Sequence, residues 1–356
     1  MKSGLLVVGR IISSSSTLPI LNNVLIKTEN GMLKISSTNL EIAITTSIRC
    51  KVEEAGEVTV ACKTISDLVN NLPNKNITLR ATSGQLEVEA ENYHTSIKTL
   101  PAEEFPLIPT VESRQVIKLD AQVLKNAIDQ VVFAAAVNQT QPEITGVLVG
   151  ADDKGLRIVA TDRYRLAEKK VNLGKVEINH EAIIPHKTAL ELSRIIGNQK
   201  GEVEMVLSET QVSFTIADTQ IISRLVDGQY PDYKQIIPTN FITTVTTEKQ
   251  PFVSALRAGG IFSQTANSIK LEYDVDKELL ILSAESSDLG KSVVELPCKA
   301  EGKSGSLILN YHYILDCLQS VDTSSVTMKI IDDSSPSLIV PEGKDDYIYL
   351  VMPIKS

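Results

Sequence analysis

Apolar and polar residues alternate with a period of two through much of the chain. Leu86–Ala90, Val212–Ile216 and Val326–Ile330 are three examples. Each predicts an antiparallel strand with one buried face and one exposed face. Turn-forming residues separate such segments, as at Glu29–Gly31 and Asp152–Gly155. The pattern therefore predicts a protein rich in antiparallel sheet.

Short segments with helical periodicity accompany the strands, two in each third of the chain. In one of them Lys187, Glu191 and Arg194 are spaced to share a polar face, with apolar residues opposite. Strands and helices that occur together in this way predict an α+β fold, with sheets on one side and paired helices on the other. So many strands leave exposed sheet edges, and pairing between neighbouring domains would cover them.

The chain also repeats itself three times, at an offset of about 123 residues. The block Leu33–Leu40 returns at Leu156–Arg163 and, more loosely, at Leu280–Glu285. Two further blocks keep the same order and a similar spacing. The second block begins at Val60, Ile183 and Ile308 in the three copies. The third block ends each copy and consists of Phe105-Pro106, Tyr230-Pro231 and Met352-Pro353. Three blocks that preserve one order are poorly explained by chance.

A repeat of this length indicates domains. Solenoid repeats are about 20 to 50 residues long, whereas single domains are most often about 100 to 150 residues. We expect three similar domains, at residues 1–112, 113–240 and 241–356. The composition, with 42% hydrophobic and 22% charged residues, is that of an ordinary globular protein.

The formal net charge of −9 taken alone argues against a nucleic-acid ligand. The predicted helices nevertheless carry scattered basic residues, and a solvated amphipathic face is the simplest interpretation of them. The four cysteines show no CxxC spacing, which favours a reduced, cytoplasmic protein. No apolar stretch is long enough for a membrane span.

A search for catalytic motifs finds none. The four histidines are isolated, and HExxH, GxSxG and GxGxxG are absent, so no metal site or cofactor is expected. Gly290-Lys291-Ser292 resembles the end of a phosphate loop, but Glu285 stands where the first glycine should be, so we interpret it as a turn. A binding or scaffolding protein is favoured over an enzyme.

Several segments closely resemble the bacterial DNA polymerase III β subunit, the sliding-clamp family. They are Ser16–Asn23, Val159–Ala167, Leu225–Tyr233 and the terminal Tyr349–Ile354. The likeness runs through essentially the whole chain in the right order. It implies three clamp-type domains per chain and a head-to-tail homodimer ring, with helices around duplex DNA and sheets outside. Implied partners are the polymerase III α subunit, the clamp loader and other clamp-motif proteins, and the implied role is that of a non-catalytic processivity factor.

The resemblance gives the basic residues a role at the central hole. An acidic protein can hold DNA if its few cations face the phosphates, because the local field depends on placement and not on net charge. Contacts to phosphates that ignore sequence also permit sliding. The implied DNA-facing residues are Arg10, Lys63, Lys125, Lys187, Arg194 and Arg257 on helices, with Asn138 and Gln141 in a loop.

The resemblance also implies a peptide cleft and a dimer interface. An apolar pocket with a polar rim suits a short linear peptide; the alternative for Leu166 and Met352 is that they are only core residues. For the dimer, the strand around Ile97 to Leu100 should face Ile261 and Phe262 of another copy. The implied cleft residues are Ile144, Thr161, Arg163, Tyr164, Arg165, Leu166, Pro231, Gln235, Ile236, Asn310, Tyr313, Ser337, Leu350, Met352, Pro353 and Ile354.

The chain departs from the family in a few places. It starts late relative to the family, so the first strand of the first domain is expected to be missing and a sheet edge uncovered. Ser13–Ser16 replace a loop that often carries a basic residue, and Arg163 and Gln235 are uncommon at their positions. The main alternative function is a clamp-fold interaction protein that does not encircle DNA, and an enzyme is a distant third.

Overall fold

The computed structural model describes residues 1–12, 18–111, 116–137, 140–174, 180–263 and 267–354. These residues form two compact units, described separately below. Unit 1 comprises Met1–Lys125 and Lys187–Leu225, and unit 2 comprises Asn126–His186 and Val226–Ser356. Among the helices of the described residues, none is both long and apolar enough to cross a membrane.

The threefold repeat of the sequence is present in the order of the elements. Each copy has a first helix and, later, a strand that runs directly into a second helix. The first helices are α1 (Lys2–Val8), α3 (Ala121–Asp129) and α5 (Lys249–Gly260). The strand–helix steps are β4 (Glu57–Ala61) to α2 (Cys62–Asn71), β12 (His180–Pro185) to α4 (His186–Ile196), and β21 (Gly305–Asn310) to α6 (Tyr311–Ser320).

One turn is conserved between the three copies inside the chain. The side-chain oxygens of Asn39, Asp162 and Ser286 each accept hydrogen bonds from the backbone N–H groups two and three residues later. In the first two copies the next residue, Leu40 or Arg163, has φ of 74° or 77°, in the left-handed region. The repeated sequence block therefore encodes a repeated local structure.

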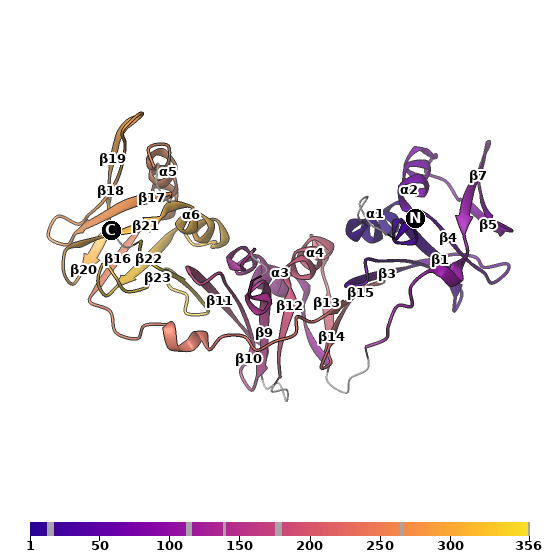
Figure 1. The fold of residues 1–356 in the computed structure, drawn as a ribbon, viewed down its shortest axis with the longest axis horizontal. Helices are drawn as coiled ribbons and strands as arrows, with labels where there is room; N and C mark the ends of the chain where they lie inside the picture. Colours follow the sequence, from indigo (N-terminus) through magenta and orange to yellow (C-terminus); the bar gives the residue numbers. More distant parts are fainter. Residues whose placement is uncertain (13–17, 112–115, 138–139, 175–179, 264–266, 355–356) are drawn as a thin grey trace. The chain divides into compact units, whose positions relative to one another are not determined.

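Unit 1 is built on one eleven-stranded antiparallel sheet, in the order β5-β6-β7-β4-β1-β2-β3-β15-β14-β13-β8. The pairing of β3 with β15, for example of Thr46 with Thr219, joins the first copy to the second edge to edge. This confirms the expected coverage of sheet edges between neighbouring copies (Figure 1). Its strands are β1 (Asn23–Glu29), β2 (Met32–Thr38), β3 (Ile42–Arg49), β4, β5 (Thr78–Thr82), β6 (Gln85–Ala90), β7 (Tyr93–Leu100), β8 (Val116–Asp120), β13 (Glu202–Leu207), β14 (Gln211–Ile216) and β15 (Thr219–Arg224).

The two ends of this sheet differ. In the second copy the strand before the first helix, β8, pairs with β13 and completes the sheet. In the first copy α1 begins at Lys2, and within the described part of the chain β5 has β6 as its one neighbour. The side chains of β5 are mostly exposed. Within the described residues β5 is therefore an edge strand of this sheet, as β8 is at the other end.

Helices α1 and α2 lie side by side over the first copy's strands (Figure 1). Leu5 and Val8 of α1, and Ile65 and Val69 of α2, are fully or almost fully buried, as their helical spacing predicts. Lys2 Nζ donates to the carbonyl oxygens of Asn70 and Leu72, both at 3.2 Å. The N-terminal helix is thus attached to the end of α2.

Unit 2 contains a nine-stranded sheet, in the order β12-β9-β10-β11-β24-β23-β22-β16-β20, and a four-stranded sheet, in the order β19-β18-β17-β21. The pairing of β11 with β24 joins the second copy to the third. Helix α5 packs on the four-stranded sheet and against α6. Besides β12 and β21, the strands of unit 2 are β9 (Gly146–Asp152), β10 (Gly155–Thr161), β11 (Arg165–Asn172), β16 (Thr243–Glu248), β17 (Ser268–Asp274), β18 (Leu279–Ser286), β19 (Gly290–Pro297), β20 (Lys299–Glu301), β22 (Ser325–Ile330), β23 (Ser337–Pro341) and β24 (Tyr347–Val351).

Short 3-10 turns connect these elements. They are η1 (Gly9–Ile11), η2 (Pro19–Asn22), η3 (Ala102–Glu104), η4 (Val132–Ala134), η5 (Pro142–Ile144) and η6 (Tyr233–Ile236). The predicted strands at residues 86–90, 212–216 and 326–330 are β6, β14 and β22, each extended by one residue. All four cysteines are free thiols, and Cys62, Cys298 and Cys317 are buried.

Candidate peptide-binding and nucleic-acid-binding sites

The turn between β10 and β11 is the centre of the candidate peptide site. Thr161 Oγ1 donates to the carbonyl of Arg165 at 2.7 Å and accepts from the N–H of Arg163 at 3.2 Å. Asp162 Oδ1 accepts from the N–H groups of Tyr164 and Arg165, both at 3.0 Å. These bonds fix the turn and make its central side chains, Arg163 and Tyr164, project outward.

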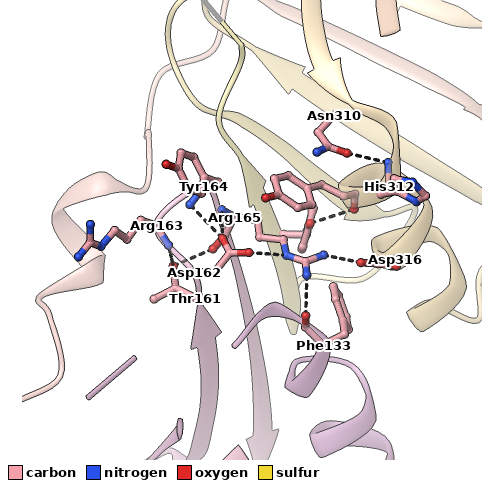
Figure 2. A network of polar contacts seen from close by, with 11 residues as sticks. Phe133, Thr161, Asp162, Arg163, Tyr164, Arg165, Asn310, His312 and Asp316 are labelled. Carbon is pink, nitrogen blue, oxygen red and sulfur yellow. Dashed lines mark hydrogen bonds and ion pairs between the residues drawn. The ribbon is translucent and has the colours of Figure 1, made fainter. Parts of the chain in front are cut away.

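Arg165 attaches this turn to the third copy (Figure 2). Its Nε lies 2.9 Å from Asp162 Oδ2, and its Nη1 donates to Asp316 Oδ2 on α6. Nη2 donates to the carbonyl of Phe133 at 2.8 Å, and the guanidinium lies over the Tyr313 ring, 4.5 Å from its centre. Three of its N–H groups are thus engaged within the chain. Its predicted contact with a peptide stays a prediction, and its observed contacts are structural.

A hydrophobic cluster lies beneath the turn. Leu166 is fully buried and Leu350, its partner across the β11–β24 pair, is 1% exposed. Met352 packs half-buried against the same cluster. Leu166 and Leu350 are therefore core residues in this structure, whereas Tyr164 and Ile236, at 62% and 47% exposed, are apolar side chains at the surface.

The segment that connects the second copy to the third is fixed to β11. Tyr233, in η6, donates from its hydroxyl to Oε2 of the buried Glu168 at 2.6 Å. Burial raises the pKa of Tyr233, and the hydrogen bond to Glu168 adds to the increase. Gln235 Nε2 donates to Asp232 Oδ2 at 2.8 Å. This anchoring holds Ile236 in its exposed position at the end of η6.

The C-terminal segment runs between the turn and β21. The N–H of Met352 donates to the carbonyl of Tyr164, and the N–H of Ile354 donates to the carbonyl of Ile308, both at 2.8 Å. Asn310 Oδ1 accepts from the N–H of His312 at 2.9 Å and so caps α6. Main-chain bonds therefore set the position of Met352, and its half-buried side chain lies next to the turn.

The structure brings most of the predicted cleft residues into this region of unit 2, but it does not expose all of them. Their role in binding a peptide stays a prediction. Those with exposed or half-buried side chains are Arg163, Tyr164, Arg165, Pro231, Gln235, Ile236, Asn310, Tyr313, Met352 and Ile354. Those that are buried are Ile144, Thr161, Leu166, Ser337, Leu350 and Pro353.

Sequence reasoning did not single out several residues that build this region. Asp162 and Tyr233 lie inside the segments that carry the family resemblance, and this signal could have identified them. Phe133, Glu168 and Asp316 lie outside the segments that carry the family resemblance. No local sequence pattern predicts their contacts with Arg165 and Tyr233. The missed residues are those that hold the loop in place.

In unit 1, the structure corrects the expectation of one solvated face on α4. Lys187 and Arg194 are exposed, but Glu191 is only 5% exposed. Its Oε1 lies 2.6 Å from Arg194 Nη1, and its Oε2 lies 3.8 Å from Nε of Arg10, which belongs to the first copy. One buried carboxylate therefore holds two of the predicted DNA-facing arginines together.

The other predicted DNA-facing residues that the structure describes lie on three different helices and in one loop. Lys63 on α2 and Arg257 on α5 are exposed, and Lys125 on α3 is half-buried. Gln141 Oε1 accepts from Arg163 Nε at 2.8 Å. Asn138 lies outside the described residues. DNA contact by these side chains stays a prediction.

Of the predicted dimer residues, Ile261 is 66% exposed and Leu100 is 39% exposed. Phe262 is half-buried. Ile97 is 7% exposed, because it packs opposite the buried Leu86 in the β6–β7 pair. Ile97 thus belongs mainly to the core of its own sheet, and the interface itself stays a prediction.

Models of three domains of one family match the chain in order. The N-terminal domain of the DNA polymerase III β subunit matches residues 3–109, the central domain matches residues 118–232, and the C-terminal domain matches residues 234–355.

Individual relatives agree with these matches. The protein named "Beta sliding clamp" of Synechocystis sp. is 29% identical, with 100% of this chain and 97% of that protein covered. The crystal structure of a DnaN sliding clamp from Pseudomonas aeruginosa superposes with a TM-score of 0.95 at 29% identity, covering 100% and 97% of the two chains. The Bacillus subtilis DNA polymerase sliding clamp superposes with a TM-score of 0.94 at 25% identity and the same coverage. The chain belongs to the DNA polymerase III β subunit family.

Proposed function

We propose that this chain is a DNA sliding clamp, which encircles duplex DNA and tethers the replicative polymerase so that synthesis becomes processive. The observation that carries this is the end-to-end match to proteins named sliding clamps, with 97% of their length covered. Strand pairing between neighbouring copies, β3 with β15 in unit 1 and β11 with β24 in unit 2, suits such a role because it joins each copy to the next. We take residues 1–112, 113–240 and 241–356 as the three domains.

The ring is proposed to be a head-to-tail homodimer. Exposed apolar side chains support this: Tyr93 and Leu100 on β7 are 50% and 39% exposed, and Ile261, Leu289 and Val293 of unit 2 are 53% to 66% exposed. A heterologous contact closes into a ring when two copies complete the rotation. We propose a cytoplasmic location, where a bacterial chromosome lies.

DNA contact in this proposal is electrostatic and independent of sequence. Lys63, Lys187, Arg194 and Arg257 are exposed cations on helices, which suits loose contact with phosphates. In this proposal the protein makes and breaks no bonds itself. It acts as a non-catalytic processivity factor.

Partner proteins are proposed to bind unit 2 through a short apolar motif of the type Gln-Leu-x-Leu-Phe. The polymerase III α subunit, the clamp loader and other proteins with such a motif are the proposed partners. Tyr164, Ile236 and Met352 offer accessible apolar surface beside polar groups. We expect affinity near micromolar, because a flexible peptide loses conformational entropy when it is ordered.

Retention on DNA of two topologies tests the ring. The protein is loaded on a nicked circular plasmid by its clamp loader with ATP, and bound protein is separated by gel filtration. We expect it to co-elute with the circle and to be released when the circle is cut once. Equal retention on the circular and linear DNA would contradict encirclement. A monomeric mass in light scattering, together with peptide binding, would favour the alternative of a clamp-fold interaction protein.

A further inference from the structure

Arg163 occupies a backbone conformation that its side chain disfavours. Its φ of 77° is in the left-handed region, which residues with a Cβ rarely adopt. Leu40, in the matching turn of the first copy, has φ of 74° and the same set of turn hydrogen bonds. The turn can therefore form around a leucine, so its geometry does not require an arginine. The backbone geometry is thus common to both copies, and what distinguishes Arg163 is its side chain and the contacts of that side chain.

The guanidinium of Arg163 is oriented but not neutralised. Its Nε donates to the neutral amide oxygen of Gln141 at 2.8 Å. Across the described residues, no carboxylate forms an ion pair with it, and no hydrogen bond uses Nη1 or Nη2. Arg165, two positions later, differs because Asp162 and Asp316 offset its charge. Figure 2 shows the two side chains extending in opposite directions from the turn.

The neighbours of Arg163 place this cation beside the apolar surface of the proposed cleft. Tyr164, the next residue, is 62% exposed, and its carbonyl holds the N–H of Met352. Because Arg163 directly precedes Tyr164 in the turn and both side chains are exposed, a peptide that covers Tyr164 would have this cation as a neighbour. A carboxylate can accept two parallel hydrogen bonds from the Nη1 and Nη2 groups of an arginine.

We propose that Arg163 is a specificity-determining residue, which selects partner peptides that carry an acidic side chain next to their apolar anchors. This rests on the proposed peptide-binding function of unit 2 and goes further by naming the chemistry of the preferred partner. Gln141 acts as a positioning residue, because it fixes Nε and directs the two Nη groups outward.

A peptide series tests this selection. The parent is Gln-Leu-Ala-Leu-Phe with two alanines at each end, and each other member has aspartate at one alanine position. Affinities are measured by fluorescence anisotropy for the full-length protein. We expect at least one aspartate peptide to bind about fivefold more tightly than the parent, the gain typical of a partly exposed charge pair. The gain should shrink as salt is added.

Four variants identify the residue responsible. In Arg163→Gly and Arg163→Gln the ratio of aspartate-peptide affinity to parent affinity should fall to about one, whatever happens to the parent affinity itself, whereas Arg163→Lys should keep most of the wild-type ratio. Leu40→Gly is the matched control, because it relieves the same strain in the first copy. Leu40→Gly and Arg163→Gly should both raise the melting temperature, and Leu40→Gly should leave every peptide affinity unchanged.

The outcomes separate the two proposals. If the parent binds but no aspartate peptide binds more tightly, or if the preference survives in Arg163→Gly, the assignment of Arg163 is wrong while the cleft stands. If neither the parent nor any aspartate peptide binds the wild-type protein, the peptide-binding proposal itself fails.

Discussion

At the scale of single residues, Arg163 and Arg165 show how one turn gives two arginines different tasks. Arg165 has a side chain that is 12% exposed, and it is surrounded by Asp162, Asp316 and the Phe133 carbonyl. A buried charge is tolerated only where partners replace the lost water. Arg165 therefore serves to attach the turn to α6, while Arg163 remains available at the surface.

Replacing Arg165 with methionine should destabilise unit 2. Methionine fills a similar volume but leaves the half-buried Asp162 and Asp316 without their cation, so we expect a loss of about 2 to 3 kcal/mol in the free energy of unfolding. Urea denaturation followed by tyrosine fluorescence measures it. Lys270→Met is the control, since its pair with Glu272 is exposed and should contribute less than about 1 kcal/mol. Equal effects of the two substitutions would show that the network is only a surface feature.

At the scale of elements, the sequence predicts the strands and helices that follow from a local pattern, but not the contacts between residues far apart in the chain. The strands β6, β14 and β22 follow from period-two alternation, and the repeat predicts that the steps into α2, α4 and α6 recur. Pairing of copies through their sheet edges follows from the cost of leaving an edge open.

Other features have no local signal. Arg165 and Asp316 are 151 positions apart in the chain, and only the assembled fold brings them together. Leu166 fits both a cleft wall and a core residue by sequence alone, and the β11–β24 pairing buries it completely. Glu191 resembles a solvated helix residue until Arg10 is placed next to it. Burial of charged and apolar side chains at the junctions between copies was thus the part that could not be predicted.

Helix α4 yields a prediction about DNA contact. Glu191 offsets the charge of Arg10 and Arg194, so it should keep their attraction for phosphates weak. Glu191→Gln retains the shape and removes the charge. We expect tighter binding to linear duplexes of any sequence and a steeper salt dependence, by about one unit in the slope of log affinity against log salt concentration.

Affinity titrations at several salt concentrations measure this effect. Glu57→Gln, at an exposed pair with Lys27 on the sheet, is the control and should change neither quantity. Weaker DNA binding by Glu191→Gln would mean that the carboxylate mainly positions the two arginines. The prediction that Glu191 weakens their attraction for phosphates would then be wrong.

At the scale of the whole molecule, the proposed ring has two identical interfaces, so each substitution at the interface acts twice. Ile261 is a largely exposed aliphatic residue that directly follows α5, and the half-buried Phe262 comes next. Scattered exposed apolar residues are ordinary on protein surfaces. The test is therefore whether these two contribute to association.

Alanine at both Ile261 and Phe262 should shift the protein towards monomers. Removing about 2 kcal/mol of apolar contact at each interface removes about 4 kcal/mol from the ring, which raises the dissociation constant of the dimer by roughly a thousandfold. Sedimentation equilibrium over a wide concentration range measures this constant. Leu107→Ala is the control, because Leu107 is 97% exposed and is not predicted to touch another copy. An unchanged dissociation constant would remove Ile261 and Phe262 from the interface, while a wild-type protein that stays monomeric at every concentration would remove the ring itself.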